Sequence, residues 1–186
     1  MIIEDGMGSG GNAEVRDHVL QVSQLSEARR ATLAGDAYVF HIDAVTIDTA
    51  DYLIALMIND DGLNRDMIVT QIVISPNTSD DDGQVEVNLG GTFGATIANS
   101  TAVVPGNCLS GNGKTAGGLF YKNDGSGDMT TEANAYIAYA QKKGIKNTPM
   151  VMSIPGGWII PHGQSISVSA DKDDKFFGCI HFYYRS

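Results

Sequence analysis

After the first 35 residues, apolar side chains recur at every second position of the chain. Tyr38, Phe40, Ile42 and Ala44 follow this period in one segment, and residues 67–75 follow it in another. Successive side chains of a β-strand point to opposite faces, so the pattern places one face of each segment in a core and leaves the other in water. The pattern therefore predicts β-strands for most of the chain.

Segments rich in Gly, Asn and Asp separate these runs, as in NDDGLN, SDDDGQ and NDGSGD. Residues of these types are typical of turns. The candidate strands are 15–22, 37–48, 52–59, 67–75, 84–89, 93–98, 117–122, 150–154, 157–160, 164–170 and 175–184. Short strands with this punctuation predict an all-β fold, a jelly-roll-like β-sandwich that occupies residues 35–186 as one domain.

One segment, TTEANAYIAYAQKKG (130–144), fits two structures. Its alanines, a Thr at the start and Lys142, Lys143 and Gly144 at the end favour a short helix. The same residues also alternate as they would in a strand. The helix is the preferred interpretation, and as an insertion between strands it would lie on the outside of the sandwich.

The residues before the sandwich differ in composition. Four glycines within EDGMGSGGNAEV make ordering costly, and few apolar groups compensate. Residues 1–34 are therefore predicted to form an extended arm that becomes ordered against a neighbouring molecule. The candidate assembly interface consists of the apolar and basic side chains Val15, Leu20, Val22, Arg29 and Arg30.

The two adjacent arginines have two interpretations. A guanidinium pairs bidentately with carboxylates, so Arg29 and Arg30 suit an acidic or backbone-rich groove on a neighbour. The alternative is a solvated pair at the end of a strand.

The chain also resembles a known family. The succession GMGSGGNAEV, HVLQV and ARRATLAGDAYVF, followed by YLIALMINDD, MIVTQIVIS and IIPHGQSISVSA, is similar to small structural proteins of tailed-bacteriophage virions. The likeness covers nearly the whole chain, and residues 125–150 depart from the family's pattern. None of these segments contains a reactive group, so the resemblance implies a place in a virus particle and no chemistry.

Charge narrows the choice of partners. The formal net charge is −10, and acidic residues gather at Asp60–Asp61, at Asp80–Asp82 and between 171 and 174. A surface of this sign repels nucleic-acid phosphates and anionic lipids. The sequence thus predicts neither a nucleic-acid nor a membrane partner, and the clusters are interpreted as solvated loop tips.

The cysteines and the apolar runs indicate where the protein folds. Two cysteines are too few for a disulfide framework, and Cys179 lies in the apolar run FFGCIHFYY, where a buried, reduced thiol is usual. No apolar run approaches the roughly 20 residues that span a bilayer, and the N-terminal residues lack the pattern of a signal peptide. A soluble protein that folds in a reducing cytoplasm is expected.

Candidate chemistry is sparse. The spacing of His18, His41, His162 and His181 does not join them to a nucleophile or into a metal site. Acidic turns such as Asp60-Asp61-Gly62 offer oxygen ligands, but they do not match the spaced ligand loop of calcium proteins, and solvated turns are the alternative. We therefore predict no catalytic residue, no metal and no cofactor.

Aromatic residues supply a second candidate surface. Trp158, Tyr136 and Tyr139 could form a platform on which a sugar ring stacks. The alternative is that they belong to the core or to a subunit interface, where Tyr and Trp are enriched.

These observations favour a non-enzymatic phage virion protein, most simply a capsid decoration or cement protein that bridges neighbouring shell subunits. Its expected partners are the major capsid protein or other virion subunits and further copies of itself, as a trimer or dimer. Its expected location is the virion, assembled in the host cytoplasm. The alternative is a tail, baseplate or head-fibre adhesin that binds a host-surface carbohydrate. A glycan-cleaving enzyme is disfavoured because the carboxylates cluster in loops.

Overall fold

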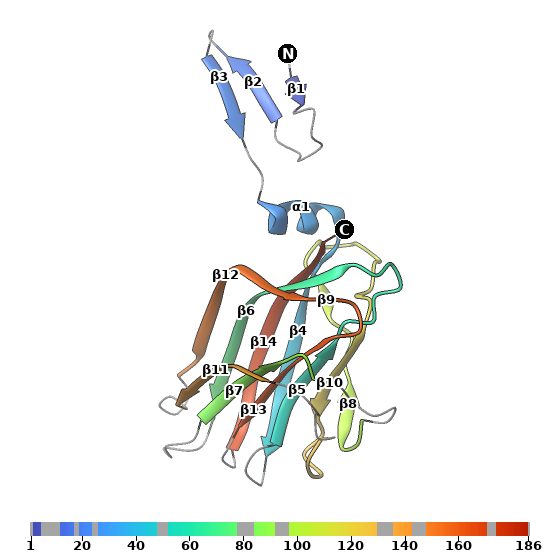
Figure 1. The fold of residues 1–186 in the computed structure, drawn as a ribbon, viewed down its shortest axis with the longest axis vertical. Helices are drawn as coiled ribbons and strands as arrows, with labels where there is room; N and C mark the ends of the chain where they lie inside the picture. The colour runs from blue at the N-terminus through green and yellow to red at the C-terminus, as the bar shows by residue number, and fades with distance from the viewer. Residues whose placement is uncertain are drawn as a thin grey trace.

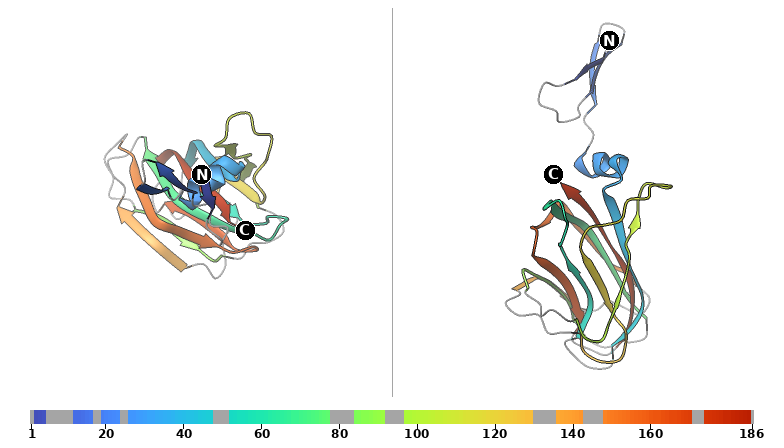
Figure 2. Two further views of the ribbon diagram at one scale, coloured as in Figure 1. Left: turned by 90° about the horizontal axis from the view of Figure 1, so that it is seen from above. Right: turned by 90° about the vertical axis from the view of Figure 1, so that its right-hand side faces the viewer.

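The computed structural model describes residues 2–4, 12–16, 19–23, 26–47, 52–77, 84–91, 97–129, 136–142, 148–170 and 174–185. Two antiparallel sheets pack face to face, with one helix at one end (Figures 1 and 2). The six-stranded sheet has the order β11 (Tyr136–Lys142), β7 (Gln84–Leu89), β13 (Ser165–Ala170), β5 (Tyr52–Ile58), β10 (Leu119–Asn123) and β8 (Ser100–Ala102). The five-stranded sheet has the order β12 (Met150–Ile160), β6 (Asp66–Pro76), β14 (Asp174–Arg185), β4 (Ala37–Ile47) and β9 (Gly106–Asn107).

The strand pairing is nested. β4 pairs with β14, β5 with β13, β6 with β12 and β7 with β11, so the chain folds back on itself as one long hairpin. The hairpin is wrapped so that β6 also pairs with β14 and β7 with β13. Eight antiparallel strands wound in this way into two sheets form a jelly roll. The predicted all-β, jelly-roll-like sandwich is confirmed.

An insertion between β7 and β11 widens both sheets on one side. Within it, β10 pairs with β5 and with β8, while β9 pairs with β4. The edge formed by β8 and β9 therefore lies opposite the edge formed by β11 and β12. The two edges of the sandwich are built from different parts of the chain.

The core lies between the two sheets and follows the alternating pattern of most strands, although every residue of β13 and five consecutive residues of β5 are buried. Near one end it contains five aromatic rings in mutual contact, with centroids 5.4–6.0 Å apart: Tyr38, Phe40, Phe120, Phe182 and Tyr184. Stacked and edge-to-face ring pairs at this spacing contribute about 0.5–1.5 kcal/mol each beyond the area they bury.

One step of the predicted alternation is wrong. Ala44 is exposed and Val45 is buried in its place. Asp43 and Ala44 together lie opposite Phe177 in β14, and Ala44 has a positive φ of 43°. This β-bulge shifts the phase of the strand by one residue.

The segment 130–144 also differs from the preferred prediction. Residues 136–142 form strand β11, paired with β7, and residues 130–135 lie outside the described residues. Pairing with a neighbouring strand outweighs the helical propensity of the alanines here, because propensity is a weak determinant beside tertiary contacts. The candidate strands 150–154 and 157–160 are one strand, β12, with a bulge between Ser153 and Trp158.

The helix of the structure, α1 (Glu27–Ala34), lies in the stretch predicted as an extended arm. The Ser26 side chain accepts a hydrogen bond from the backbone of Arg29, and Gly35, with φ 74°, ends the helix. These are the usual N-cap and C-terminal residues of a helix. Ala31 packs on Ala37, Ile68 and Tyr183, which attaches α1 to the sandwich.

The preceding residues form a small antiparallel sheet of β1 (Ile2–Glu4), β2 (Asn12–Arg16) and β3 (Val19–Ser23). Figures 1 and 2 show this sheet beyond α1, apart from the sandwich. The candidate strand 15–22 corresponds to parts of β2 and β3, with 17–18 outside the described residues. Of the candidate strand 93–98, residues 97–98 are not in a strand and 92–96 lie outside that range.

We predict that Gly178→Ala destabilises the fold by about 1–3 kcal/mol. A Cβ at this position in β14 would lie 2.0 Å from the carbonyl oxygen of Val73 in β6, so the two central strands would have to move apart. Gly62→Ala is the matched control, because a Cβ there meets no atom within 4 Å. Chemical denaturation measures both free energies of unfolding, and equal values for the two variants would contradict the prediction.

Candidate functional site

Several loops meet at the end of the sandwich that carries α1, which we call the helix end. Asn59 is fully buried there, at the end of β5. Its side-chain amide donates hydrogen bonds to the carbonyls of Arg65, at 2.9 Å, and of Ile160, at 2.8 Å. Its backbone exchanges hydrogen bonds with the turn at 163–164. Asn59 thus fixes the 59–65 loop against the turn that follows β12.

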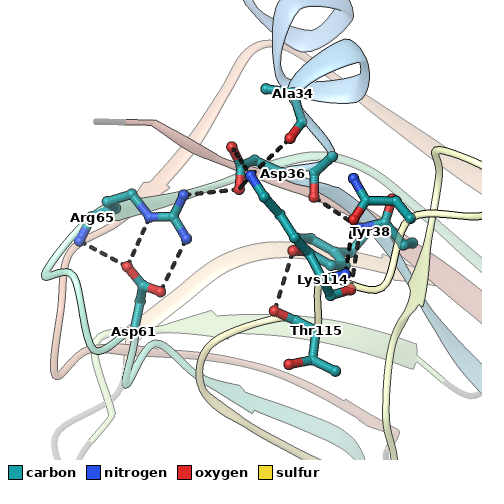
Figure 3. A network of polar contacts seen from close by, with 10 residues as sticks. Ala34, Asp36, Tyr38, Asp61, Arg65, Lys114 and Thr115 are labelled. Atoms are coloured by element: carbon teal, nitrogen blue, oxygen red, sulfur yellow. Dashed lines mark hydrogen bonds and ion pairs between the residues drawn. The ribbon is translucent and has the colours of Figure 1, made fainter.

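Arg65 is the centre of an ion network at the helix end (Figure 3). Its Nε donates to Oδ2 of Asp61 at 2.9 Å, and its Nη2 donates to Oδ1 of the same carboxylate at 3.1 Å. Its Nη1 donates to Oδ1 of Asp36 at 3.0 Å. The guanidinium also lies against the ring of Tyr184, with Cζ 4.8 Å from the ring centroid. A planar guanidinium suits both contacts, whereas a lysine ammonium could not make the bidentate pair.

The network continues to the insertion between β7 and β11. Nζ of Lys114 lies 3.3 Å from Oδ1 of Asp36 and donates to the carbonyl of Ala34 at 2.8 Å (Figure 3). The hydroxyl of Tyr38 donates to the carbonyl of Thr115 at 3.2 Å. These contacts join the end of α1, the start of β4 and the insertion.

The electrostatics of the network follow from burial and pairing. Asp61 is only 4% exposed, and hydrogen bonds from the Arg65 side chain lower its pKa. Those same bonds raise the pKa of Arg65 further above its usual value. Burial, followed by the nearby Asp61 charge, raises the pKa of Tyr184. At neutral pH Asp61 and Arg65 are therefore charged and Tyr184 is neutral.

Asp61 therefore departs from both interpretations of its acidic turn. It is neither a solvated loop residue nor arranged as a calcium ligand, because both of its oxygens accept hydrogen bonds from Arg65. Asp60 beside it is exposed. The other acidic clusters, 80–82 and most of 171–174, lie outside the described residues.

A groove of about 280 Å³ lies between α1 and the end of β14. It is lined by Glu27, Arg30, Ala31, Ala34, Asp36, Tyr183, Tyr184 and Arg185. Nε of Arg30 is buried without a hydrogen-bond partner among the described residues. Glu27 accepts a hydrogen bond from the Tyr183 hydroxyl at 3.2 Å, so this carboxylate is already engaged.

A second groove, of about 430 Å³, lies beside the turn that follows β12. Tyr136, which is 60% exposed, and Ile159 supply apolar surface. His162, Gln164 and Ser165 supply polar groups. An exposed aromatic ring beside polar side chains can bind a sugar or a partner side chain.

The predicted site residues fall into three places. Arg29 is exposed on α1, and Arg30 on the same helix lines the groove against β14. Val15 lies in β2, and Leu20 and Val22 lie in β3, but their side chains are outside the described residues.

The three aromatic candidates are not equivalent. Tyr136 lines the second groove, whereas Tyr139 and Trp158 are partly buried against the core. Trp158 is at the end of the bulge in β12, which sets its position in the sheet. The structure thus leaves Tyr136 as the exposed member of the three.

Among the described residues, the histidines and cysteines are exposed or partly buried, and His18 lies outside that range. His162 lies in an exposed turn, 3.6 Å from Asp60. His41 and Cys179 are opposite each other on β4 and β14, and Cys179 lies 3.5 Å from His181. Burial, and secondarily the proximity of His41, lower the pKa of His181. Within the described residues no group of three such side chains has the geometry of a metal site. The sequence predicted a buried thiol at Cys179, whereas in the structure this residue is partly buried.

Sequence reasoning missed α1, Asn59 and the role of Arg65. Ser26 and Gly35 bracket an eight-residue helix and are recognisable capping residues. The Asp61 and Arg65 pair has no such local signal, because their contact depends on how the 59–65 loop folds.

A scan against models of known protein families finds no matching family, and searches of curated proteins and of solved structures find no match either. The described part of the chain contains no helix long and apolar enough to cross a bilayer. The fold defines the class: an all-β jelly-roll sandwich, with a helix and a small separate sheet at one end.

We predict that Arg65→Met lowers the free energy of unfolding at neutral pH by about 3 kcal/mol, because it leaves the Asp61 carboxylate buried and unpaired. Arg185→Met is the control. Arg185 pairs with Asp66 at 3.2 Å, both side chains are about two-fifths exposed, and the loss should be less than about 1 kcal/mol.

The same pair of variants has a distinct pH dependence. In the wild type the folded-state pKa of Asp61 is depressed, so its contribution is complete above the ordinary value of 3.8 and is lost as the pH falls through the folded pKa. In Arg65→Met the buried carboxylate resists ionisation instead. The stability difference from wild type should therefore shrink below about pH 5. A constant difference across that range would contradict this account.

Proposed function

We propose that this protein is a non-enzymatic structural component of a phage virion, a capsid decoration or cement protein that bridges neighbouring shell subunits. The observation that carries the proposal is the small sheet of β1, β2 and β3, which lies beyond α1 and apart from the sandwich (Figure 1). A sheet this small has little stability of its own and gains it by packing on another surface. In the proposed assembly, a neighbouring subunit provides the surface on which this sheet packs.

The fold is consistent with the proposed virion function. Jelly rolls serve in viral capsid proteins and in lectins, and a fold alone does not define a function. In the proposed mechanism, the N-terminal segment adds its strands to the edge of a neighbouring shell subunit, where main-chain hydrogen bonds provide affinity. Many copies on a symmetric lattice then add avidity. The resemblance to small virion proteins of tailed phages points in the same direction.

The Arg65 network has a defined part in this mechanism. It joins the end of α1, the start of β4 and the 59–65 loop through Asp36 and Asp61. A segment that bears load must enter a rigid body, and a network of partly buried charge-assisted hydrogen bonds supplies rigidity at its point of entry.

We predict that a chain lacking residues 1–25 folds but is not incorporated into particles, because α1 and its capping residue remain while the docking segment is lost. Circular dichroism checks the fold, and quantitative mass spectrometry of purified particles measures the copy number relative to the major shell protein. A full-length ratio near one, or one per few shell subunits, is expected. Unchanged incorporation of the shortened chain would exclude the docking mechanism, and absence from particles would exclude a virion protein.

The second candidate is a tail, baseplate or head-fibre adhesin that binds a carbohydrate. The groove beside Tyr136 favours it, because an exposed ring stands there next to His162 and Gln164. For this candidate we predict glycan-array binding by the full chain that is lost in Tyr136→Ala. Leu63→Ala, an exposed apolar residue outside the groove lining, should leave binding intact. An array without any bound glycan would count against the adhesin.

A further inference from the structure

The edge of the sandwich formed by β11 and β12 differs in charge from the rest of the chain. Residues 147–170, which include all of β12, contain no Asp, Glu, Lys or Arg, although the chain has a net charge of −10. β12 is the end strand of one sheet and β11 the end strand of the other. Exposed edge strands commonly carry charges that prevent pairing with other chains. β12 carries none over its eleven residues.

This edge also exposes apolar side chains. Val151 and Ile159 in β12 are 56% and 50% exposed, and Ile137 in β11 is 57% exposed. Between the two strands the core is closed by Tyr139, Met150 and Met152, which are only partly buried. These three side chains line a small apolar cavity with residues of β6 and β7. Methionine adapts readily to the shape of a partner.

We propose that the β11–β12 edge is the contact face between two copies of this chain, related by a twofold axis. Two copies of charge −10 repel each other across acidic surfaces, whereas neither β11 nor β12 contains an Asp or Glu and only Lys142, at the end of β11, is charged, so two copies can approach here without that cost. A partner selected by charge attraction would find no charged residue along β12. In a twofold contact both copies present the same patch, so one apolar edge is sufficient.

The dimensions agree with a dimer contact. β12, with eleven residues, extends about 37 Å, and β11, with seven, about 24 Å. Each strand with its side chains covers a strip about 10 Å wide, so the face covers about 600 Å² per copy, at the lower end of standard interfaces. The bulge between Ser153 and Trp158 interrupts β12, so side chains make this contact and not one continuous strand ladder.

The test is the mass of the purified full chain in solution, measured by light scattering or sedimentation. The wild type should have twice the mass of the 19.7 kDa chain. Val151→Lys and Ile159→Lys should shift it to the single-chain mass, with at least a roughly tenfold weaker dissociation constant. The matched control is Val104→Lys. Val104 is 78% exposed and lies between β8 and β9, at the opposite edge, so this variant should keep the wild-type mass.

A full-length variant of the N-terminal segment separates this contact from strand exchange by that segment. Replacing Val15, Leu20 and Val22 with serine should leave the dimer intact. The proposal would be overturned if this variant lost the dimer, or if the Lys variants folded and remained dimeric. It would also be overturned if the wild type had the mass of one chain at the highest attainable concentration, or the mass of three chains. The dimer contact needs no shell partner. The protein could therefore be a virion component without forming this dimer, and it could form the dimer without being a virion component.

Discussion

The pairing of β4 with β14 is the constraint on which the rest of the structure depends. These are the first and last strands of the sandwich, and they lie side by side in the middle of one sheet. This outer pair encloses the three inner pairs of the nested hairpin in sequence, and β14 also pairs with β6, so the centre of the five-stranded sheet is built on it. Contacts between such distant parts of the chain make folding slow, on the order of milliseconds to seconds for comparable β-sandwiches.

The same constraint determines where the free surfaces lie. β14 and β13 are paired on both sides, whereas the end strands are paired on one side and β4 meets β9 at only two residues. The insertion between β7 and β11 supplies the end strands of one edge, and β11 and β12 form the other. The loops of the helix end are held by Asn59 and Arg65. The contacts proposed above would therefore fall on the edges and the helix end, while the sheet interior contributes to stability.

The sequence allowed the two-sheet fold to be predicted because inward positions of a strand recur with a period of two, and few interruptions disturb that period. Prediction failed where a contact overrides a local preference. Alanines favoured a helix in residues that pair with β7, and a bulge at Ala44 exposed a position expected in the core. The burial of Asp61 depends on Arg65 and on a folded loop, whereas its neighbours in sequence are turn residues. The position of Trp158 likewise depends on the bulge in β12.

The arrangement of Asp36 and Arg185 has a mechanical consequence. These residues lie at the start of β4 and the end of β14, and the two strands are antiparallel, so both are found at the helix end. A tensile load applied between them would separate the central pair one hydrogen bond at a time, beginning at that end, and would not shear all the bonds together. Arg65 and Lys114 form ion pairs with Asp36 at the end where this separation would begin, so the ion network opposes the separation of the two strands.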